Sequence, residues 1–322
     1  MKAVMFHELG GPEVLKVGEA PVPEPRKGWV RIKVHASGIN FADTLFRQGQ
    51  YLMKPNLPDI PGLEAAGVVD AVGEGVTHLK PGMRVTAIGT KTYAEYCTVS
   101  AAQVIPLPDH VGYEDGVAFP IQTLTAYHML HTSHTTTPGQ TVVVHSAAGG
   151  VGIVAVQIAK AAGARVIGTV SSNSKFDLVK QYGADEVVNY ASTDFADEVM
   201  KLTDNKGADL ILDAVGKPTL EKGLKCLAPF GHLILYGRAG GIPDPVNLMS
   251  LFQKSTKVSG FVLYTVSSMP DKHQAGVDKA FQLMKEGKLK MLIGKSYPMA
   301  EAPEAHRHME SRGSVGKLVL IP

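Results

Sequence analysis

One stretch of this chain, residues 139–163, constrains the fold more than any other, and it reads GQTVVVHSAAGGVGIVAVQIAKAAG. Thr141 to His145 is a short β-branched apolar run of the kind found in buried parallel strands, and residues 146–152 follow as a glycine-rich turn. Gly163 stands where a helix often ends. Apolar residues recur between them at helical period, at Val151, Val154, Ala155, Ile158, Ala159 and Ala162. The stretch predicts a strand, a tight turn and a helix in succession.

This turn lies at the N-terminus of the predicted helix, where free backbone N–H groups and the helix dipole attract phosphate. Gly149 would let the backbone approach a pyrophosphate, and Gly152 would let helix and strand pack closely. The pattern is A-x-G-x-x-G, with Ala147 where the dinucleotide fingerprint has its first glycine. We therefore predict a nucleotide-binding unit whose turn residues contact the cofactor: Ala148, Gly149, Gly150, Val151 and Gly152.

Length and composition set the outer limits. The chain has 322 residues, of which 44% are hydrophobic, and this favours a globular protein of two domains. We find no targeting signal and no apolar stretch long enough to span a bilayer, so we expect no membrane association. Only Cys97 and Cys226 are cysteines, which fits a reducing cytoplasm. A net charge of +2, from 32 basic and 30 acidic residues, does not indicate nucleic-acid binding.

The first part of the chain, to about residue 122, alternates short strands with Gly and Pro turns, which is typical of a compact, barrel-like β domain. One helix is expected within it, over residues 41–48, with Asn40 as its cap, Gly49 as its end and an i,i+4 pair between Asp43 and Arg47. The expected strands cover residues 2–6, 14–17, 30–35, 66–72, 84–88, 93–99 and 104–107.

After a helical stretch around residues 123–130, strands and helices alternate, and six strands complete a doubly wound parallel (Rossmann) sheet. Those strands begin at Thr141, Arg165, Glu186, Asp209, His232 and Lys257. The tail from about residue 268 should carry helices near 275–286 and 301–310 and a strand at 317–321. We expect it to return to the first domain, which makes residues 1–122 and 268–322 one domain and residues 123–267 the cofactor domain, with the active site in the cleft between.

Four segments carry a resemblance to a known family: SGINFADTLFRQGQY near residue 40, GLEAAGVV at 62, HSAAGGVG at 145 and ESRGSVGKLVLIP at the end. With this domain order, the chain resembles the zinc-independent quinone oxidoreductase (zeta-crystallin-like) branch of the medium-chain dehydrogenase/reductase superfamily. The resemblance implies a GroES-like catalytic domain beside the Rossmann domain. It also implies NADPH-dependent reduction of quinones or other activated C=C–C=O compounds, by a homodimer or higher oligomer.

Zinc alcohol dehydrogenases share this architecture, so a metal has to be considered. Their first zinc ligand is a cysteine where this chain has Asn40, and their histidine ligand stands where this chain has Leu63. Leucine cannot ligate a metal, and two cysteines cannot form a four-cysteine structural site. His128, His131 and His134 recur every three residues, a spacing that turns successive side chains around a helix instead of converging them. We therefore expect no metal.

Without a metal, the acceptor must be electrophilic by itself, as a quinone or an α,β-unsaturated carbonyl is, and the protein mainly orients the reactants and excludes water. We place Asn40 and Tyr51 of the first domain and Gln122 and Thr125 of the domain junction around the reacting groups. Asn40 is either a helix cap or a polar contact to substrate or cofactor. Tyr51 is either a proton donor to the reduced acceptor or a half-buried aromatic.

Cofactor choice depends on the end of the second Rossmann strand, where an NAD-specific domain has an acidic residue. Here the strand is followed by Ser171, and the first acidic residue after it is Asp177. The resemblance implies that Lys175, Tyr190 and Arg312 surround the 2′-phosphate of NADPH. Further cofactor contacts are expected at the carboxyl ends of later strands, at Val215, Gly216 and Gly237.

Three function classes stay open at this level. Quinone reduction leads, and reduction of enals, enones or enoyl thioesters by the same hydride step is the alternative. The third class is a non-enzymatic NADPH- or RNA-binding protein, because the resembling family includes lens crystallins and reported RNA binders. The balanced charge argues against RNA, whose binding would weaken steeply with salt.

Overall fold

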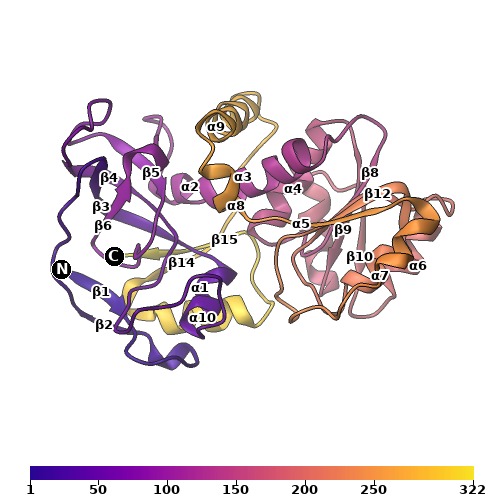
Figure 1. Ribbon diagram of the computed structural model, residues 1–322, viewed down its shortest axis with the longest axis horizontal. Coiled ribbons are helices and arrows are strands. Elements are labelled where there is room, and N and C mark those ends of the chain that lie inside the picture. The colour runs from indigo at the N-terminus through magenta and orange to yellow at the C-terminus, as the bar shows by residue number, and fades with distance from the viewer. The chain divides into compact units, whose positions relative to one another are not determined.

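The computed structural model describes all 322 residues and divides the chain into two compact units. Met1–Ile121 and Met291–Pro322 form the first unit, and Gln122–Lys290 forms the second. Most of the helices and strands of each unit are labelled in Figure 1. None of the helices combines the length and the apolar character needed to span a membrane.

The first unit is built on a seven-stranded sheet in the order β14-β15-β3-β4-β5-β7, with β6 also paired to β3 and a separate hairpin of β1 and β2. Its strands are β1 (Lys2–Met5), β2 (Lys16–Glu19), β3 (Trp29–Ile39), β4 (Glu64–Val72), β5 (Arg84–Ile88), β6 (Tyr96–Ser100), β7 (Val104–Pro106), β14 (Ile293–Pro298) and β15 (Lys317–Ile321). Its helices are η1 (Pro12–Val14), α1 (Phe41–Arg47), η2 (Ala101–Gln103), α2 (Tyr113–Val117), η6 (Met299–Glu301) and α10 (Ala302–Glu310).

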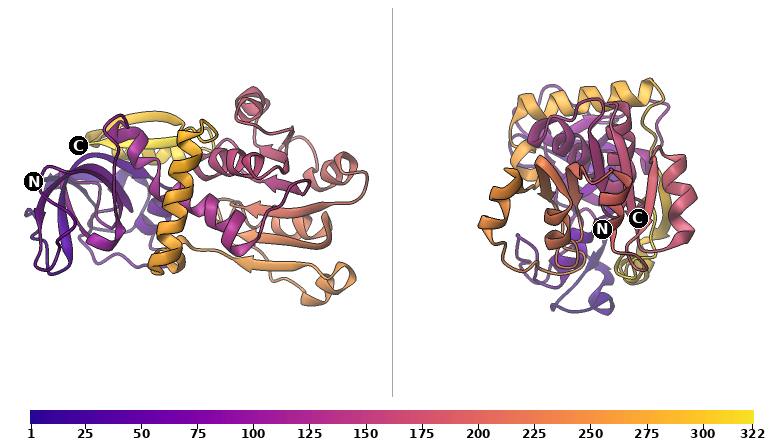
Figure 2. Two further views of the ribbon diagram at one scale, coloured as in Figure 1. Left: turned by 90° about the horizontal axis from the view of Figure 1, so that it is seen from above. Right: turned by 90° about the vertical axis from the view of Figure 1, so that its right-hand side faces the viewer.

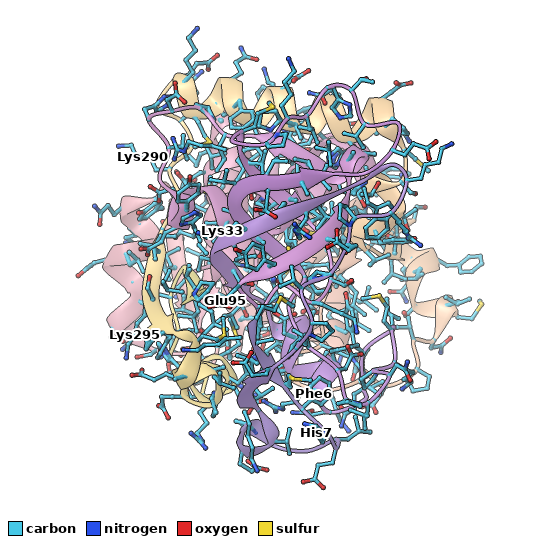
Figure 3. The ribbon with its side chains drawn as sticks, turned by 90° about the vertical axis from the view of Figure 1, so that its left-hand side faces the viewer. Phe6, His7, Lys33, Glu95, Lys290 and Lys295 are labelled. Carbon is cyan, nitrogen blue, oxygen red and sulfur yellow. The ribbon has the colours of Figure 1, made fainter.

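The long central strand β3 shows why this unit folds as it does. Val30, Ile32 and Val34 alternate with polar residues and are buried in one core cluster. Lys33 lies on the opposite, exposed face, where Figure 3 labels it near Glu95. β15 pairs antiparallel with β3 and parallel with β14, so the end of the chain joins the sheet of the first unit.

The second unit is a six-stranded sheet in the order β10-β9-β8-β11-β12-β13, and every pair in it is parallel. Numbered within the unit, this is the order 3-2-1-4-5-6 of a complete Rossmann sheet, as predicted. Its strands are β8 (Thr141–Val144), β9 (Arg165–Val170), β10 (Glu186–Asn189), β11 (Ala208–Asp213), β12 (Leu227–Leu235) and β13 (Lys257–Gly260). Its helices are α3 (Pro120–His128, which begins at the boundary with the first unit), η3 (Met129–Ser133), α4 (Gly150–Ala161), η4 (Asn173–Lys175), α5 (Phe176–Gln181), α6 (Phe195–Leu202), α7 (Leu220–Lys225), η5 (Leu248–Lys254), α8 (Leu263–Ser267) and α9 (Pro270–Lys285).

The second unit extends further along the chain than the sequence suggested, to Lys290 instead of residue 267. The side chain of Gln157, in α4, explains the extension. Its Oε1 accepts the backbone N–H of Lys290 at 2.8 Å, and its Nε2 donates to the Lys290 carbonyl at 3.0 Å. The chain after α9 is thereby fastened to α4, so α9, the long uninterrupted helix of Figure 2, belongs to the second unit.

Three local predictions were wrong in detail. The strand expected at residues 14–17 starts only at Lys16, as β2, because Pro12 begins the 3-10 turn η1, which includes Val14. The helix expected over residues 123–130 begins earlier, as α3 (Pro120–His128), and continues as a π-helical turn, η3 (Met129–Ser133). The helix α4 is buried over the whole of residues 152–159, not on one face only.

Candidate active site

The turn between β8 and α4 has the shape of a dinucleotide cradle. Ser146 adopts a left-handed conformation with φ of 53°, and its carbonyl accepts the N–H of Gly149 at 2.9 Å. A Cβ on Gly152 would lie 2.2 Å from the Ser146 carbonyl oxygen, so only glycine lets the helix start this close to the strand. Because Ser146 takes the left-handed conformation and Ala147 does not, alanine is tolerated where the fingerprint has its first glycine.

The first turn of α4 presents backbone donors to this cradle. Gly149 is the N-cap residue and no side chain caps the helix, so the N–H groups of Gly150, Val151 and Gly152 have no intrahelical acceptor. Ala148, just before them, is buried. These are the groups that bind a pyrophosphate in a Rossmann fold, and the twelve-residue helix adds its dipole. The residues present therefore fit a dinucleotide.

A buried carboxylate shapes the loop after β11. Asp213 Oδ1 accepts the N–H groups of Val215 at 2.7 Å and Gly216 at 3.0 Å, and Thr219 Oγ1 lies 2.9 Å from both carboxylate oxygens. Gly216 has φ of 87°, and a Cβ on Gly237 would lie 2.7 Å from the Ala214 carbonyl oxygen. The loops after β11 and β12 therefore pack backbone against backbone at the carboxyl edge of the sheet, where such folds bind ligands.

The carboxyl ends of β9 and β10 bring three predicted cofactor residues to one place. Ser171 directly follows β9, Lys175 ends η4, and Tyr190 follows β10 with its N–H bonded to the Val170 carbonyl at 3.0 Å. Asn189 Nδ2 donates to Asn173 Oδ1 at 2.7 Å and ties the two loops together. Burial lowers the pKa of the Lys175 ammonium. No acidic side chain lies between Val170 and Lys175.

Sequence reasoning missed a cavity at the carboxyl ends of β12 and β13. It has a volume of ≈ 410 Å³ and is lined by Ser133, Leu235, Gly260, Phe261, Val262, Thr265 and Val266. The lining is mainly apolar, which suits the flat ring of an acceptor or a nicotinamide. Ligands bind at the carboxyl ends of parallel strands, and this rule applies to Gly260 as it does to Gly216 and Gly237. The sequence could therefore have predicted a ligand site here.

In the first unit, Asn40 lies between β3 and α1 with its side chain held on both sides. Its Nδ2 donates to Glu64 Oε1 at 2.8 Å, and its Oδ1 accepts from Lys317 Nζ at 2.8 Å. Tyr51 is half-buried in the bend after α1, and its pKa is raised by burial and by the nearby Asp43. The phenol therefore keeps its proton at neutral pH.

Gln122 and Thr125 belong to α3 in the second unit and are both buried. They stand three residues apart and so share a helix face. Arg312 belongs to the first unit, in the turn after α10 with φ of 61°. The meeting of Arg312 with Lys175, and of Asn40 and Tyr51 with the nucleotide cradle, stays a prediction.

The predicted ion pair between Asp43 and Arg47 is wrong. Arg47 is fully buried and donates instead to Glu310 Oε1 at 2.5 Å, to the Gly10 carbonyl at 3.0 Å and to His306 Nδ1 at 2.9 Å. Asp43 accepts the backbone N–H of Asn40 at 2.8 Å. Tertiary partners outweigh the i,i+4 pair because both side chains lie on the buried side of α1.

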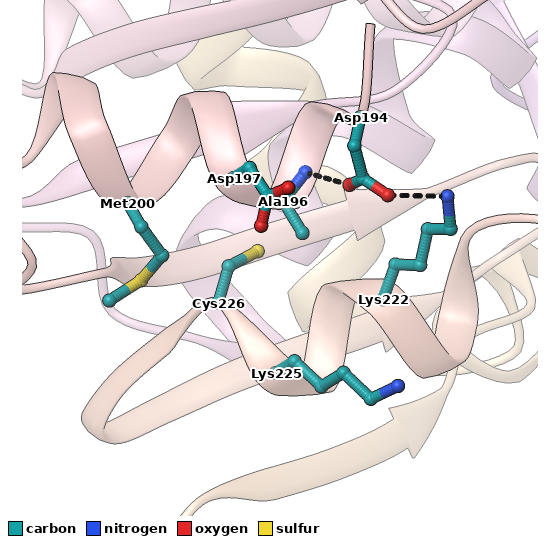
Figure 4. Close-up of a pocket in the computed structure, with 7 residues that line it drawn as sticks. All are labelled: Asp194, Ala196, Asp197, Met200, Lys222, Lys225 and Cys226. Carbon is teal, nitrogen blue, oxygen red and sulfur yellow. Dashed lines mark hydrogen bonds and ion pairs between the residues drawn. The ribbon is translucent and has the colours of Figure 1, made fainter.

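A second cavity, of ≈ 340 Å³, lies between α6 and α7 (Figure 4). Asp194 caps α6 through the Ala196 N–H at 2.9 Å and pairs with Lys222 at 2.6 Å, while Lys225 pairs with Glu221 at 2.7 Å. Because Asp194, Lys222 and Lys225 are already engaged in these contacts, we assign no chemistry to this cavity.

Comparison with known proteins now decides the family. Residues 26–109 match the alcohol dehydrogenase GroES-like domain, and residues 150–286 match the zinc-binding dehydrogenase domain. A quinone oxidoreductase of Pseudomonas aeruginosa is 39% identical over 100% of this chain and 99% of its own length. The chain belongs to the quinone oxidoreductase family of medium-chain dehydrogenases/reductases. A GroES-like domain beside a Rossmann domain is the fold of that family, as predicted.

Two further members of this family bear on function. The Escherichia coli quinone oxidoreductase, solved in complex with NADPH, superposes with a TM-score of 0.96 at 34% identity and 100% coverage of both chains. A 2-haloacrylate reductase of Burkholderia is 34% identical over 99% of this chain and 98% of its own length. The family thus contains reductases of different acceptors on one scaffold.

Because the matched domain is described as zinc-binding, we ask whether the side chains of this chain could bind a metal ion. Asn40 is already bonded to Glu64 and Lys317, Leu63 has no donor atom, and Glu64 is paired with Lys317. No group of three or more His, Cys, Asp or Glu side chains converges anywhere in the structure. His128 Nδ1 pairs with Thr132 and His134 Nε2 with Gln140, away from a common point. The residues present do not fit a zinc ion.

Proposed function

We propose that this chain is an NADPH-dependent quinone reductase that works by hydride transfer without a metal. The observation that carries the proposal is a complete dinucleotide cradle in a chain similar to quinone oxidoreductases over its whole length. The E. coli relative was solved with NADPH, which supports the choice of cofactor. The carboxyl end of β9 has a lysine and no acid, as a 2′-phosphate requires.

The residues that would hold NADPH are the predicted ones. The amides of Gly150, Val151 and Gly152 would bind the pyrophosphate, with Ala148 and Gly149 beneath it. Ser171, Lys175, Tyr190 and Arg312 would surround the 2′-phosphate. The loops at Val215, Gly216 and Gly237, with Gln122 and Thr125, would hold the nicotinamide end. When bound, NADPH supplies the hydride.

The remaining chemistry belongs to the chain's own side chains. A quinone needs no Lewis acid, because its carbonyl groups already make it electrophilic. Asn40 has a rigidly held amide whose remaining N–H would polarise the acceptor oxygen, and the Tyr51 phenol, protonated at neutral pH, would donate a hydrogen bond or a proton. The apolar cavity beside β13 would keep water from the reacting carbon.

Oxidation of NADPH, followed at 340 nm against a panel of acceptors, tests the proposal. The panel comprises 1,4-benzoquinone, a naphthoquinone, a short enal, a crotonyl thioester and 2-chloroacrylate. We expect the quinones to give the highest kcat/KM. Turnover of the unsaturated carbonyl compounds alone would reject quinone reduction, and no turnover of any acceptor would reject the reductase.

The second candidate is an NADPH-dependent reductase of activated C=C bonds in enals, enones or enoyl thioesters. The 34% identical 2-haloacrylate reductase favours it, since a family member with that name reduces an electron-poor double bond. A quinone is a vinylogous enone, so the same cradle and Tyr51 serve both reactions. The acceptor panel decides between them.

We propose further that the chain forms a homodimer through the edge of the second unit's sheet. β13 pairs with β12 on one side only, and an exposed edge strand favours pairing with another strand. Leu248, Met249 and Phe252 are exposed in η5, the helix that precedes β13 in the chain, with Phe252 at 72%. Light scattering should give twice the chain mass of 34.3 kDa, and Phe252→Glu should shift it toward the monomer. A monomeric wild type would reject this interface.

Both cysteines are free and buried, and burial raises the pKa of each thiol to about 12. Such thiols suit a reducing compartment, and we place the protein in the cytoplasm. Fractionation of the source cells tests this, since recovery in an oxidising compartment would contradict it.

A further inference from the structure

Three side chains from distant parts of the first unit form a closed hydrogen-bonded ring. Lys317 Nζ donates to Asn40 Oδ1 at 2.8 Å, and Asn40 Nδ2 donates to Glu64 Oε1 at 2.8 Å. The ring is closed by the ion pair between Lys317 Nζ and Glu64 Oε1. Glu64 Oε2 accepts the Ile121 N–H at 3.0 Å, so both carboxylate oxygens are used.

The two charges of this ring are removed from water, with side-chain exposures of 3% for Lys317 and 0% for Glu64. Removing two charges from water costs free energy, and apolar residues of similar size would avoid this cost. Stability alone therefore does not explain why the pair is buried here. It is the Asn40 amide that both charges contact. A role for the pair in orienting this amide accounts for its presence.

The sheet register brings the ring together. β15 pairs with β3 so that Leu318 faces Ile39, and β3 pairs with β4 so that Ser37 faces Ala65. Lys317 precedes Leu318 and Glu64 precedes Ala65. The two side chains therefore meet beside Asn40. A Cβ on Gly38 would lie 2.4 Å from Glu64 Oε1 and 2.6 Å from Lys317 Cε, so the pair lies directly over this glycine.

The ring fixes which way the Asn40 amide points. An ammonium group only donates and a carboxylate only accepts, so the amide oxygen must face Lys317 and the amide nitrogen must face Glu64. A flipped amide would place donor against donor and acceptor against acceptor. The second N–H of the amide remains outside the ring, and the charged partners at both ends polarise it as a donor.

We propose that Glu64 and Lys317 are positioning residues for Asn40, and that they hold its outer N–H toward the carbonyl oxygen of the acceptor during hydride transfer. The inference rests on the proposed function, because it needs Asn40 to contact the acceptor. It assigns a positioning role to two charges that are removed from water.

A double-mutant cycle on the full-length protein tests the inference. Lys317→Met is made in the wild type and in Asn40→Ala, and kcat and KM are measured with 1,4-benzoquinone and NADPH. Asn40→Ala should lower kcat by about ten- to a hundredfold. Lys317→Met should lower it by a similar factor in the wild type and by less than about twofold in Asn40→Ala, with the KM for NADPH unchanged.

Two further variants guard against loss of folding. Glu64→Gln/Lys317→Met removes both charges together, so neither is left buried without its partner. The matched control is Glu310→Gln, which removes the charge that pairs with the buried Arg47 in the same unit but does not touch Asn40. The control should lower the unfolding temperature without lowering kcat, whereas the double variant should lower kcat as Lys317→Met does.

The outcomes separate the two claims. If the effects of Asn40→Ala and Lys317→Met multiply, the ring does not act through Asn40 and the inference is wrong, while the proposed function stands. If Asn40→Ala has wild-type kinetics, the contact of Asn40 with the acceptor is wrong and the inference fails with it. If Glu310→Gln lowers kcat as much as Lys317→Met, general loosening of the unit explains both.

Discussion

The phenol of Tyr93 donates a hydrogen bond of 3.0 Å to the buried carboxyl group of Asp43. The hydrogen bonds that connect Tyr93 to His306 and Arg47 can run in only one direction. Arg47 can only donate to His306 Nδ1, at 2.9 Å, so the His306 proton is on Nε2 and faces the Tyr93 oxygen at 3.3 Å. Asp43 Oδ1 has no partner, and burial raises the pKa of this carboxyl to about 7 against the opposing effect of its hydrogen bonds. Asp43 is therefore partly protonated at neutral pH.

This raised pKa makes stability depend on pH. Between about pH 4 and pH 7 the folded state binds a proton at Asp43 that the unfolded chain has released, so the free energy of unfolding falls as pH rises through this window. Asp43→Asn removes the titration and keeps an acceptor for Tyr93. In urea titrations at pH 5, 6 and 7, the wild type should lose up to about 1.4 kcal/mol per pH unit relative to the variant. A difference that is constant with pH would contradict the assignment.

His306 should act in the opposite direction. Its pKa is lowered to about 3, mainly by burial and further by Arg47. Below about pH 6.5 the unfolded chain binds a proton that the folded state does not, so stability is present above this pH and is lost as pH falls. His306→Gln should therefore flatten the acid side of the stability profile, measured by urea titration between pH 6.5 and pH 4.5. An acid limb as steep as that of the wild type would show that other histidines cause it.

These contacts mark the limit of prediction from the sequence. The strand, turn and helix at residues 141–161 depend on neighbours in the chain, so residue type and period were enough to predict them. The partner of Arg47 was not predictable, because Glu310 is 263 residues away and only the folded sheet brings the two together. Lys317 and Glu64 were missed for the same reason. The sequence does not show whether a lysine is buried or exposed, because the fold alone determines its surroundings.

Tyr51 offers a test of proton donation. If its phenol protonates or polarises the acceptor in the transition state, Tyr51→Phe should lower kcat and kcat/KM together by roughly ten- to a hundredfold. A quinone dianion is less basic than an enolate, so the loss should be larger with an enal than with a quinone. Steady-state kinetics with both acceptors check this. Unchanged rates with both would leave Tyr51 as a packing residue.

Metal removal offers another test. Because Leu63 has no donor atom and Asn40 and Glu64 are engaged with Lys317, the purified protein should contain no stoichiometric zinc. Activity should be unchanged after dialysis against excess EDTA. Elemental analysis by mass spectrometry measures the metal content directly. One zinc per chain, with activity lost on chelation and regained with zinc, would overturn the metal-free mechanism.

Cofactor preference is the most direct test of the nucleotide site. A 2′-phosphate carries close to two negative charges at neutral pH, and one opposite charge at 4 Å interacts with a unit charge by about 4 kcal/mol at an effective dielectric near 20, before desolvation. Solvent removes most of this. A net contribution of roughly 1 to 2 kcal/mol from each of Lys175 and Arg312, with no opposing acid, predicts an NADPH preference of about a hundredfold in kcat/KM.

The gain should appear as cofactor affinity, because the 2′-phosphate lies far from the transferred hydride and is held equally in the ground and transition states. Lys175→Ala and Arg312→Ala should therefore raise the KM for NADPH by roughly five- to thirtyfold each, with little change in kcat and nearly unchanged kinetics with NADH. Lys180→Ala, on the exposed side of α5, is the matched control and should change neither. Equal use of NADH and NADPH by the wild type would refute the 2′-phosphate site. An NADH defect in Lys175→Ala as large as its NADPH defect would instead show that Lys175 supports the loop after β9 and does not read the phosphate.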